Sequence, residues 1–219
     1  MCAKINDNSN NNLYKSLLDG NKQFVENTLK KDPEYFENLA LGQSPPVLWI
    51  GCADSRVPAN QITNTAPGQI FVHRNIANMV IHSDMNMLSV LDYAVSVLKV
   101  KHVIVTGHYG CGGVMAAISN EQFGLIDNWL RHIKDVYRLH AKELDQITGI
   151  DERCDRLVEY NVIENVYNLC KTSIVQNAWQ TGQPLGVHGW VYSLSTGIIT
   201  DMKVSAYDNA NMDNVFKFK

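Results

Sequence analysis

The chain has 219 residues, of which 45% are hydrophobic and 19% are charged, and its formal net charge at pH 7 is −3. A chain of this length and composition can bury one substantial core, as globular proteins do. The slight negative charge argues against nucleic acid or an anionic membrane as a partner. We expect a cytoplasmic protein, because the N-terminus has no apolar signal core and no apolar run approaches about 20 residues.

The N-terminal part of the chain divides into a polar tail and two helical segments. Residues 1–12 are rich in asparagine and predict a disordered tail, and we expect residues 13–219 to form a single domain. Apolar residues recur at helical spacing over 13–31. Pro33 can open a second short helix that ends near Leu41, because proline is favoured in the first turn of a helix.

The rest of the chain alternates short apolar runs with longer helical patterns. Continuous apolar or β-branched runs predict buried strands, and apolar residues at helical spacing predict the helices between them. The turn-forming segment Ser195-Thr196-Gly197 predicts a terminal hairpin with an antiparallel edge strand. The expected strands cover 47–51, 69–74, 102–106, 187–192 and 197–200; the expected helices cover 87–98, a segment from about Gly113, 126–144, and one or two helices over 158–179.

This order of elements predicts the fold class. Strands that are separated by helices need crossover connections, and such connections give parallel strands with helices on the sheet. The β-branched run 102–106 is the best candidate for a central strand, which both neighbours would bury. We therefore expect an α/β fold with a mainly parallel β-sheet flanked by helices.

Two of the five cysteines stand apart from the others. An odd number of cysteines in a protein expected in the cytoplasm does not favour a disulfide framework. Cys170 follows Leu169 on the apolar face of a predicted helix, and we expect it in the core. Only Cys52 and Cys111 lie in glycine-containing segments that directly follow predicted strands.

The segments 51–56 and 107–113 predict a metal site. Each follows a strand-like run, so both should leave the same rim of the sheet. They supply the thiols of Cys52 and Cys111 and the imidazole of His108, which are ligand types that zinc binds readily. Three protein ligands leave one position of a tetrahedral ion open, which is typical of a catalytic site rather than a structural one.

Asp54 and Arg56 accompany these ligands. The next two alternate positions after Cys52 are Asp54 and Arg56. In an extended segment every second side chain points to the same face, so these three side chains share one face. A two-pronged pair with Arg56 would keep the Asp54 carboxylate ionised and oriented. Because such a carboxylate only accepts hydrogen bonds, it would orient a zinc-bound hydroxide as the nucleophile.

Other interpretations of the same residues remain open. Cys52 could be a nucleophile with His108 as its base, but Cys111 and the Asp54–Arg56 pair would then have no role. The glycine-rich loop could cradle a phosphate. However, its glycines do not follow the G-x-G-x-x-G order, and no acidic residue stands about 20 positions further on.

Taken together, the motifs C-x-D-S-R at 52–56 and G-H-x-x-C-G-G at 107–113 resemble the β class of carbonic anhydrases. The similarity extends from about Leu13 to Val204 and includes the segments 71–75, 124–129 and 188–190. It implies that zinc-bound hydroxide hydrates CO2 reversibly to bicarbonate and a proton. It also implies one zinc per chain, the ligands Cys52, His108 and Cys111, and the catalytic dyad Asp54–Arg56.

The same resemblance implies a substrate pocket and an assembly. Four residues match positions that line a small, mostly apolar pocket: Gln43, Phe71, Ile76 and Tyr93. The backbone amides near Cys111 and Gly112 would help to hold the developing oxyanion. An N-terminal helical arm would embrace a second subunit, giving a homodimer that can pair into a dimer of dimers.

Some members of the family are inhibited by bicarbonate, and this chain resembles that design. In those members Asp54 can move onto the zinc as a fourth ligand and close the site. Bicarbonate in a neighbouring non-catalytic pocket stabilises the closed state, and the residues of that pocket match Trp49, Arg74 and Tyr192.

Two further alternatives are hydrolysis of a CO2 analogue (CS2 or COS) at the same zinc and a permanently closed sensor domain. Retention of Arg56 argues against the sensor.

Overall fold

The computed structural model describes residues 8–218, which form two units that we describe separately. The first unit extends to Gln43 and the second runs from Ser44 to Lys219. The first contains α1 (Asn8–Leu29) and α2 (Tyr35–Ala40). The boundary at Gln43 falls inside the range 13–219 that the sequence predicts as one domain. Within the polar segment that the sequence predicts to be disordered, the chain is helical from Asn8 onward. Its residues 1–7 lie outside the described part of the chain.

The two N-terminal helices explain why this unit is separate. Phe24 of α1 and Phe36 of α2 pack edge to face, with ring centroids 5.9 Å apart. The apolar face of α1 is otherwise exposed, and Leu17 is 66% accessible. Helical spacing correctly predicted an amphipathic helix, and within this unit its apolar side chains remain accessible.

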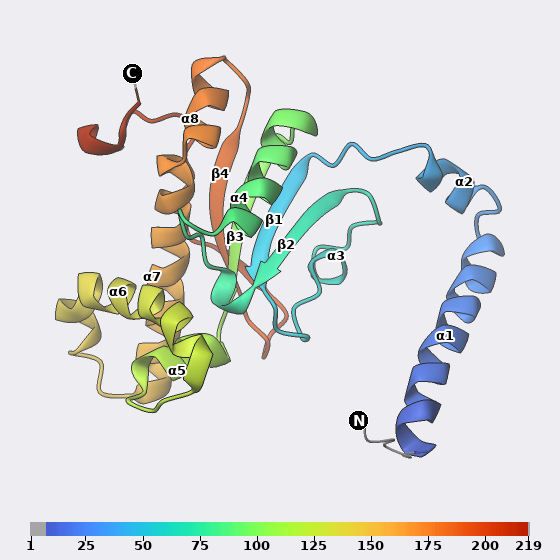
Figure 1. Cartoon of the computed structure of the whole chain (residues 1–219), viewed down its shortest axis with the longest axis horizontal. Helices are drawn as coiled ribbons and strands as arrows, with labels where there is room; N and C mark the ends of the chain where they lie inside the picture. The colour runs from blue at the N-terminus through green and yellow to red at the C-terminus, as the bar shows by residue number, and fades with distance from the viewer. Residues whose placement is uncertain (1–7, 219) are drawn as a thin grey trace, which may run out of the picture. The chain divides into compact units, whose positions relative to one another are not determined.

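The second unit is built on one five-stranded sheet with the strand order β2-β1-β3-β4-β5 (Figure 1). The first four strands in this order pair in parallel, and β5 pairs with β4 in antiparallel fashion, as predicted. β3 is the central strand, also as predicted. The strands are β1 (Val47–Cys52), β2 (Ile70–Asn75), β3 (His102–His108), β4 (Gly186–Tyr192) and β5 (Ile199–Asp201).

The larger helices of this unit pack on one face of the sheet and bury the main core, whereas the two end residues of α3 (Ala59–Ile62) pack in a smaller cluster on the other face. Leu48 and Ile50 of β1 belong to that core, whereas Trp49 between them belongs to a smaller apolar cluster on the opposite face. None of the helices within residues 8–218 is both long and apolar enough to span a bilayer. The helices are α3 (Ala59–Ile62), η1 (Ile76–Asn78), α4 (Met85–Asp92), η2 (Tyr93–Val97), α5 (Gly112–Ile118), η3 (Gly124–Ile126), α6 (Asp127–Leu144), α7 (Ile150–Lys171), α8 (Ser173–Gln180) and η4 (Asn214–Phe216).

Two expected helices are divided in the structure. The pattern over 87–98 becomes the α-helix α4 followed by the wider π-helical turn η2. The pattern over 158–179 becomes α7 and α8, because Thr172 ends the first helix and caps the second. Its Oγ1 accepts a hydrogen bond from the backbone N–H of Val175 at 3.3 Å. Apolar periodicity continues across both junctions, so it could not locate them.

Two glycines seat α7 on the sheet. A Cβ atom at Gly107 of β3 would lie 2.7 Å from Cγ2 of Val162, and one at Gly189 of β4 would lie 2.8 Å from Cγ1 of the same valine. Val162 of α7 therefore occupies the space that side chains at these two positions would need. This close approach brings α7 next to the end of β3, where the predicted metal ligand His108 stands.

Candidate metal centre

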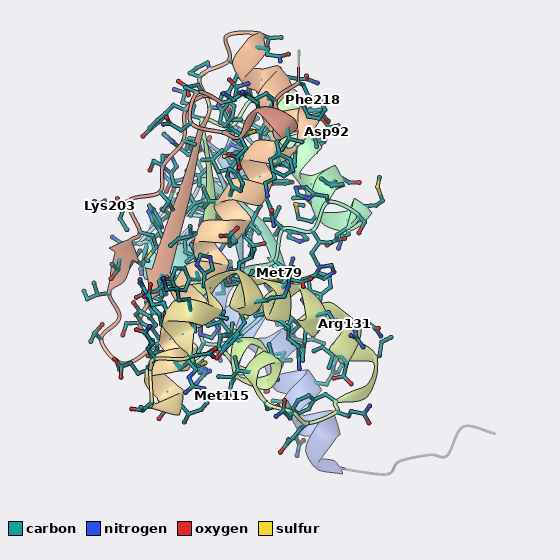
Figure 2. All side chains as sticks on the ribbon, turned by 90° about the vertical axis from the view of Figure 1, so that its left-hand side faces the viewer. Met79, Asp92, Met115, Arg131, Lys203 and Phe218 are labelled. Carbon is teal, nitrogen blue, oxygen red and sulfur yellow. The ribbon has the colours of Figure 1, made fainter. Side chains whose placement is uncertain are left out.

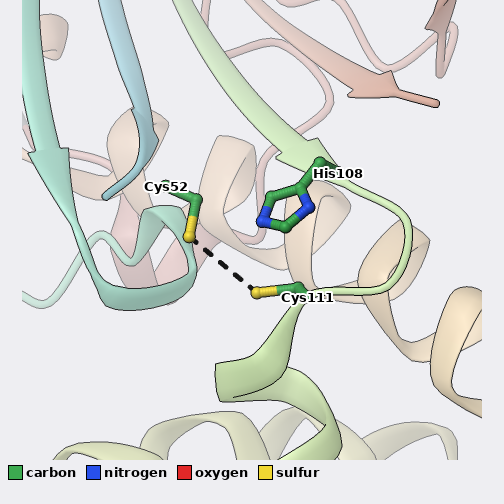
Figure 3. Close-up of side chains that lie close together, drawn as sticks. All are labelled: Cys52, His108 and Cys111. Carbon is green, nitrogen blue, oxygen red and sulfur yellow. Dashed lines mark hydrogen bonds between the residues drawn. The ribbon is translucent and has the colours of Figure 1, made fainter. Parts of the chain in front are cut away.

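The three predicted zinc ligands meet at the carboxyl ends of two neighbouring parallel strands (Figure 3). Cys52 is the last residue of β1, and His108 is the last residue of β3. Cys111 follows the tight turn at Gly110 and stands at the N-cap of α5. The carboxyl ends of parallel strands are where α/β proteins place their ligands, so the strand order explains why Cys52 and His108, which are 56 positions apart in sequence, converge.

The distances fit a tetrahedral zinc ion. The Sγ atoms of Cys52 and Cys111 are 3.9 Å apart, and two sulfurs bound to one zinc at about 2.3 Å lie about 3.8 Å apart. The three ligand atoms all lie within 4.8 Å of one another. Nδ1 of His108 donates to the carbonyl oxygen of Tyr109 at 3.0 Å, which leaves Nε2 free as a ligand. That Nε2 is buried and has no hydrogen-bond partner among the described residues, as a metal-ligating atom would.

The sulfurs of Cys52 and Cys111 lie within hydrogen-bond distance, and either could donate. A proton shared between them lowers the pKa of Cys52 to about 4 despite burial. The same hydrogen bond raises the pKa of Cys111, and burial raises it further. Backbone N–H groups of Asp54 and Ala77 also face the sulfur of Cys52 and favour its thiolate. These contacts favour the thiolate form of Cys52.

Asp54 and Arg56 form the pair that their spacing predicts. Nε and Nη2 of Arg56 donate to the two carboxylate oxygens at 2.9 and 2.7 Å, and the backbone N–H of Arg56 donates to Oδ1 at 2.9 Å. These hydrogen bonds lower the pKa of Asp54 well below its ordinary value. Oδ2 of Asp54 lies 3.7 Å from Nε2 of His108, so an ionised carboxylate stands directly beside the ligand set.

Arg74 holds the backbone on which the dyad stands. Its Nε donates to the carbonyl oxygen of Cys52 at 2.9 Å, and its Nη2 donates to the carbonyl oxygen of Asp54. In sequence Arg74 was assigned only to a bicarbonate pocket, and these backbone contacts were not foreseen. Parallel pairing places Arg74 beside Gly51, two residues after Trp49.

The structure also brings together the other two residues of the predicted bicarbonate pocket. Trp49 and Tyr192 belong to the same small apolar cluster, and the ring centroids of Trp49 and Trp190 are 6.1 Å apart. Thr106 lies between Gly51 and Trp190 in the sheet register. Its hydroxyl is buried without a hydrogen-bond partner among the described residues.

The predicted substrate-pocket residues are only partly brought together. Phe71 and Tyr93 pack against each other with ring centroids 5.8 Å apart. Ile76 lies against the start of α5, where a Cβ at Gly113 would be 2.8 Å from its Cγ2. Gly112 is exposed at the first position of α5. Gln43 belongs to the N-terminal unit, which the structure describes by itself.

Sequence reasoning missed the contacts that hold the loop between His108 and Cys111. The hydroxyl of Tyr109 donates to Oε1 of Glu159 at 2.7 Å, and the backbone N–H of Gly110 donates to Oδ1 of Asp155 at 3.2 Å. Both carboxylates come from α7. The acidic residues at 155 and 159 stand one helical turn apart in the sequence, but nothing local indicates which loop they hold.

Comparisons with known proteins identify the family of this chain. The family model described as "Carbonic anhydrase" matches residues 47–199. A carbonic anhydrase from Emericella nidulans is 50% identical over 192 residues, which cover 87% of this chain and 84% of that relative. A tetrameric β-carbonic anhydrase from Sordaria macrospora has a TM-score of 0.85 and 38% identity, and the match covers 89% of this chain and 99% of that one. The Coccomyxa β-carbonic anhydrase, solved with acetazolamide, has a TM-score of 0.86 and 39% identity over 90% of this chain and 89% of that one. The chain therefore belongs to the β class of the carbonic anhydrases, a family of zinc enzymes.

Proposed function

We propose that this chain catalyses the reversible hydration of CO2 to bicarbonate and a proton, with one zinc ion held by Cys52, His108 and Cys111. The observation that carries the proposal is the adjacency of Asp54 to this ligand set, 3.7 Å from Nε2 of His108. A structural zinc site fills all four positions with protein ligands, whereas this one offers three ligands and a neighbouring carboxylate that another residue already holds.

Zinc bound here would supply a water molecule acidified enough to act as the nucleophile near neutral pH. The protein's own part is orientation. Because Arg56 keeps Asp54 ionised, the carboxylate can only accept a hydrogen bond, and it therefore selects an oxygen that still carries a proton. The fork of Arg56 also fixes the direction in which the free lone pairs of Asp54 point.

The surroundings of the ligands suit a small apolar substrate. Phe71, Tyr93 and Ile76 contribute apolar surface, and we propose that they line the CO2 pocket. The N–H groups of Gly113 and Val114 at the start of α5 face the sulfur of Cys111. The N–H of Gly112 in the same turn is the remaining donor. We assign it the role of binding the developing oxyanion.

Stopped-flow CO2 hydration by the zinc-loaded protein between pH 7 and 9 tests this function. We expect turnover that follows zinc content and that is lost in Cys52→Ser, which removes a ligand. Absence of turnover with one zinc per chain bound would contradict the proposal. Sulfide release from CS2 or COS by the same sample would then point to hydrolysis of a CO2 analogue.

We further propose that bicarbonate inhibits the enzyme at Trp49, Arg74 and Tyr192. Arg74 supports the backbone carbonyls of Cys52 and Asp54, so an anion that draws its guanidinium away would loosen the segment that carries the dyad. Asp54 would then be free to leave Arg56 and become a fourth zinc ligand. Added bicarbonate should suppress initial rates in the wild type and have a much smaller effect in Tyr192→Phe, and equal suppression in both would count against this pocket.

We also propose that the enzyme is a homodimer or a dimer of dimers. The exposed apolar face of α1 supports this, because a second subunit would remove it from water. The Sordaria relative is tetrameric. Light scattering after size-exclusion chromatography measures the assembly, and Leu17→Glu on the exposed face should shift it toward a smaller species.

The state of the thiols supports a cytoplasmic location. The four cysteines in the described part of the chain are all unpaired. Free buried thiols of this kind persist in reducing compartments. Imaging of a fluorescent fusion in the source cells tests the location.

A further inference from the structure

A segment with an unusual backbone contacts the metal ligand Cys52. Residues Ile76 to Val80 connect β2 to α4, and within them Ala77 has φ +62° and Asn78 has φ +50°. Two consecutive residues other than glycine in the left-handed region are uncommon, because each Cβ clashes with the backbone there. Such a conformation persists only where the surroundings hold it. Asn75, which directly precedes the segment, pairs with Cys52 in the sheet, and the N–H of Ala53 donates to the carbonyl oxygen of Asn75 at 2.8 Å. This pairing places the segment beside Cys52, with the N–H of Ala77 facing its sulfur.

Three asparagines of α7 hold this segment. Nδ2 of Asn161 donates to the carbonyl oxygen of Ala77 at 2.9 Å, and Oδ1 of Asn165 accepts from the N–H of Val80 at 2.5 Å. Nδ2 of Asn168 donates to the carbonyl oxygen of Val80 at 3.2 Å. The three residues stand at i, i+4 and i+7, so they share one face of the helix. Figure 2, in which Met79 is labelled, shows the segment beside α6 and α7.

The asparagines also fix each other. Nδ2 of Asn165 donates to both the backbone oxygen and Oδ1 of Asn161, at 2.6 and 3.1 Å. Asn161 therefore presents its amide N–H group, not its oxygen, to Ala77. Asn161 and Asn165 are 1% and 0% accessible, so their hydrogen bonds are shielded from competing water. This polar ladder crosses an otherwise apolar interface between α7 and the segment.

The segment is fixed from its other sides as well. Nε1 of Trp129 on α6 donates to the carbonyl oxygen of Ile76 at 2.9 Å. The side chain of Asn75 accepts from the N–H of Met79 at 2.7 Å and donates to its carbonyl oxygen at 2.8 Å. These contacts hold the two ends of the segment. Asn161 holds its middle, because it binds the carbonyl oxygen of Ala77, the residue whose N–H faces the sulfur of Cys52.

We infer that Asn161 is a positioning residue for the zinc site: through the carbonyl oxygen of Ala77 it holds the left-handed backbone that directs the Ala77 N–H at the sulfur of Cys52. A backbone N–H at a ligating thiolate orients the sulfur and neutralises part of its charge, as outer-shell partners of metal ligands do. The inference rests on the proposed assignment of Cys52 as a zinc ligand.

The test compares two truncations on the same buried helix. Asn161→Ala removes the donor to Ala77, and Val166→Ala removes core contacts that face Gly189 of β4 instead. Zinc release into a chelator should be faster in Asn161→Ala by about 10- to 100-fold, with little change in Val166→Ala. The cobalt-substituted protein should show a shifted sulfur-to-cobalt charge-transfer band in Asn161→Ala alone.

A double variant tests the route of the effect. Glycine adopts positive φ without the Cβ clash, so Ala77→Gly in the Asn161→Ala background should restore most of the lost zinc retention. Should Asn161→Ala not fold, Asn165→Ala takes its place, with a smaller acceleration expected because it acts through Asn161. Zinc release at the wild-type rate in the asparagine variant, or equal acceleration in Val166→Ala, would overturn the inference. Failure of the wild type to bind one zinc, or unchanged binding in Cys52→Ser, would instead contradict the proposed site.

Discussion

Tyr109, in the turn between His108 and Cys111, donates a hydrogen bond from its hydroxyl to Glu159 on α7 at 2.7 Å. Glu159 also accepts from Nη1 of Arg156 at 2.6 Å, so the loop is tied to a charged network on the helix. The loop between His108 and Cys111, which we call the metal loop, is thus held by a contact between residues 50 positions apart.

Tyr109→Phe removes this hydroxyl and should lower the free energy of unfolding by about 1 kcal/mol, the usual value of one hydrogen bond. Tyr137→Phe is a matched control, because the hydroxyl of Tyr137 donates to Asp145 at 2.6 Å, away from the metal loop. Urea unfolding gives both free energies. Only Tyr109→Phe should also quicken zinc release, and equal zinc release in the two variants would show that the loop does not need this anchor.

The same tyrosine predicts a loss of stability in alkali. Burial, together with the hydrogen bond to Glu159, raises the pKa of Tyr109 from 10 to about 12. Between these values the unfolded chain has lost the phenolic proton and the folded chain has kept it, so the free energy of unfolding falls as pH rises from 10 to 12. Urea titrations across this range should show a shallower fall in Tyr109→Phe than in the wild type.

Substitutions of Asp54 and Arg56 should lower kcat to different extents. Asp54→Asn keeps the shape but no longer offers an acceptor-only group, so kcat for CO2 hydration should fall at least about 100-fold. Arg56→Lys keeps the charge but loses the fork that orients Asp54, so we expect a smaller loss. Stopped-flow rates with zinc content measured on each sample check this order. Wild-type kcat in Asp54→Asn would remove Asp54 from the mechanism.

Zinc affinity should rise with pH. The raised pKa of Cys111 leaves its thiol protonated in the metal-free protein, so binding must release that proton, which gives about a tenfold gain in affinity per pH unit. Cys52, with a pKa of about 4, is already ionised and adds no dependence above pH 6. Burial lowers the pKa of His108, but the neighbouring Cys52 sulfur outweighs burial and raises that pKa, so loss of the His108 proton should make the slope steeper at the acid end of the range. Chelator competition between pH 6 and 9 measures the slope, and a flat profile would contradict the shared proton.

The remaining buried thiols should be inert. Burial raises the pKa of Cys154 to about 11 and that of Cys170 to about 12, so at pH 8 almost no thiolate is present at either. Iodoacetamide at pH 8, followed by peptide mapping, should modify Cys52 in the zinc-stripped protein and leave these two unmodified. Alkylation of Cys170 in the folded protein would indicate that α7 opens locally.

The convergence of Cys52, His108 and Cys111 could be predicted from sequence, because they lie in two short motifs that each directly follow a recognisable strand. The strand order then follows from crossover connections. The bidentate contact of Arg56 with Asp54 is equally local, since only one residue separates them. Local spacing and strand ends thus account for the centre of the site.

What could not be predicted depends on contacts between distant parts of the chain. Asn161 and Ala77 are 84 residues apart, and nothing near either residue indicates the other. The backbone contacts of Arg74 and the left-handed φ of Ala77 likewise follow from packing. The division of the long helical patterns at η2 and Thr172 was hidden, because the apolar spacing continues through both.

Gly107 and Gly189, which pack against Val162, determine the position of α7 along its own axis on the sheet. Because one valine fits against Gly107 and Gly189 together, the helix has one axial register on the sheet. Asn161 is the next residue, so this register also sets the height at which its amide meets Ala77. A methyl group at either glycine would therefore act at a distance: it would displace a whole helix and carry that displacement to the backbone beside the Cys52 sulfur.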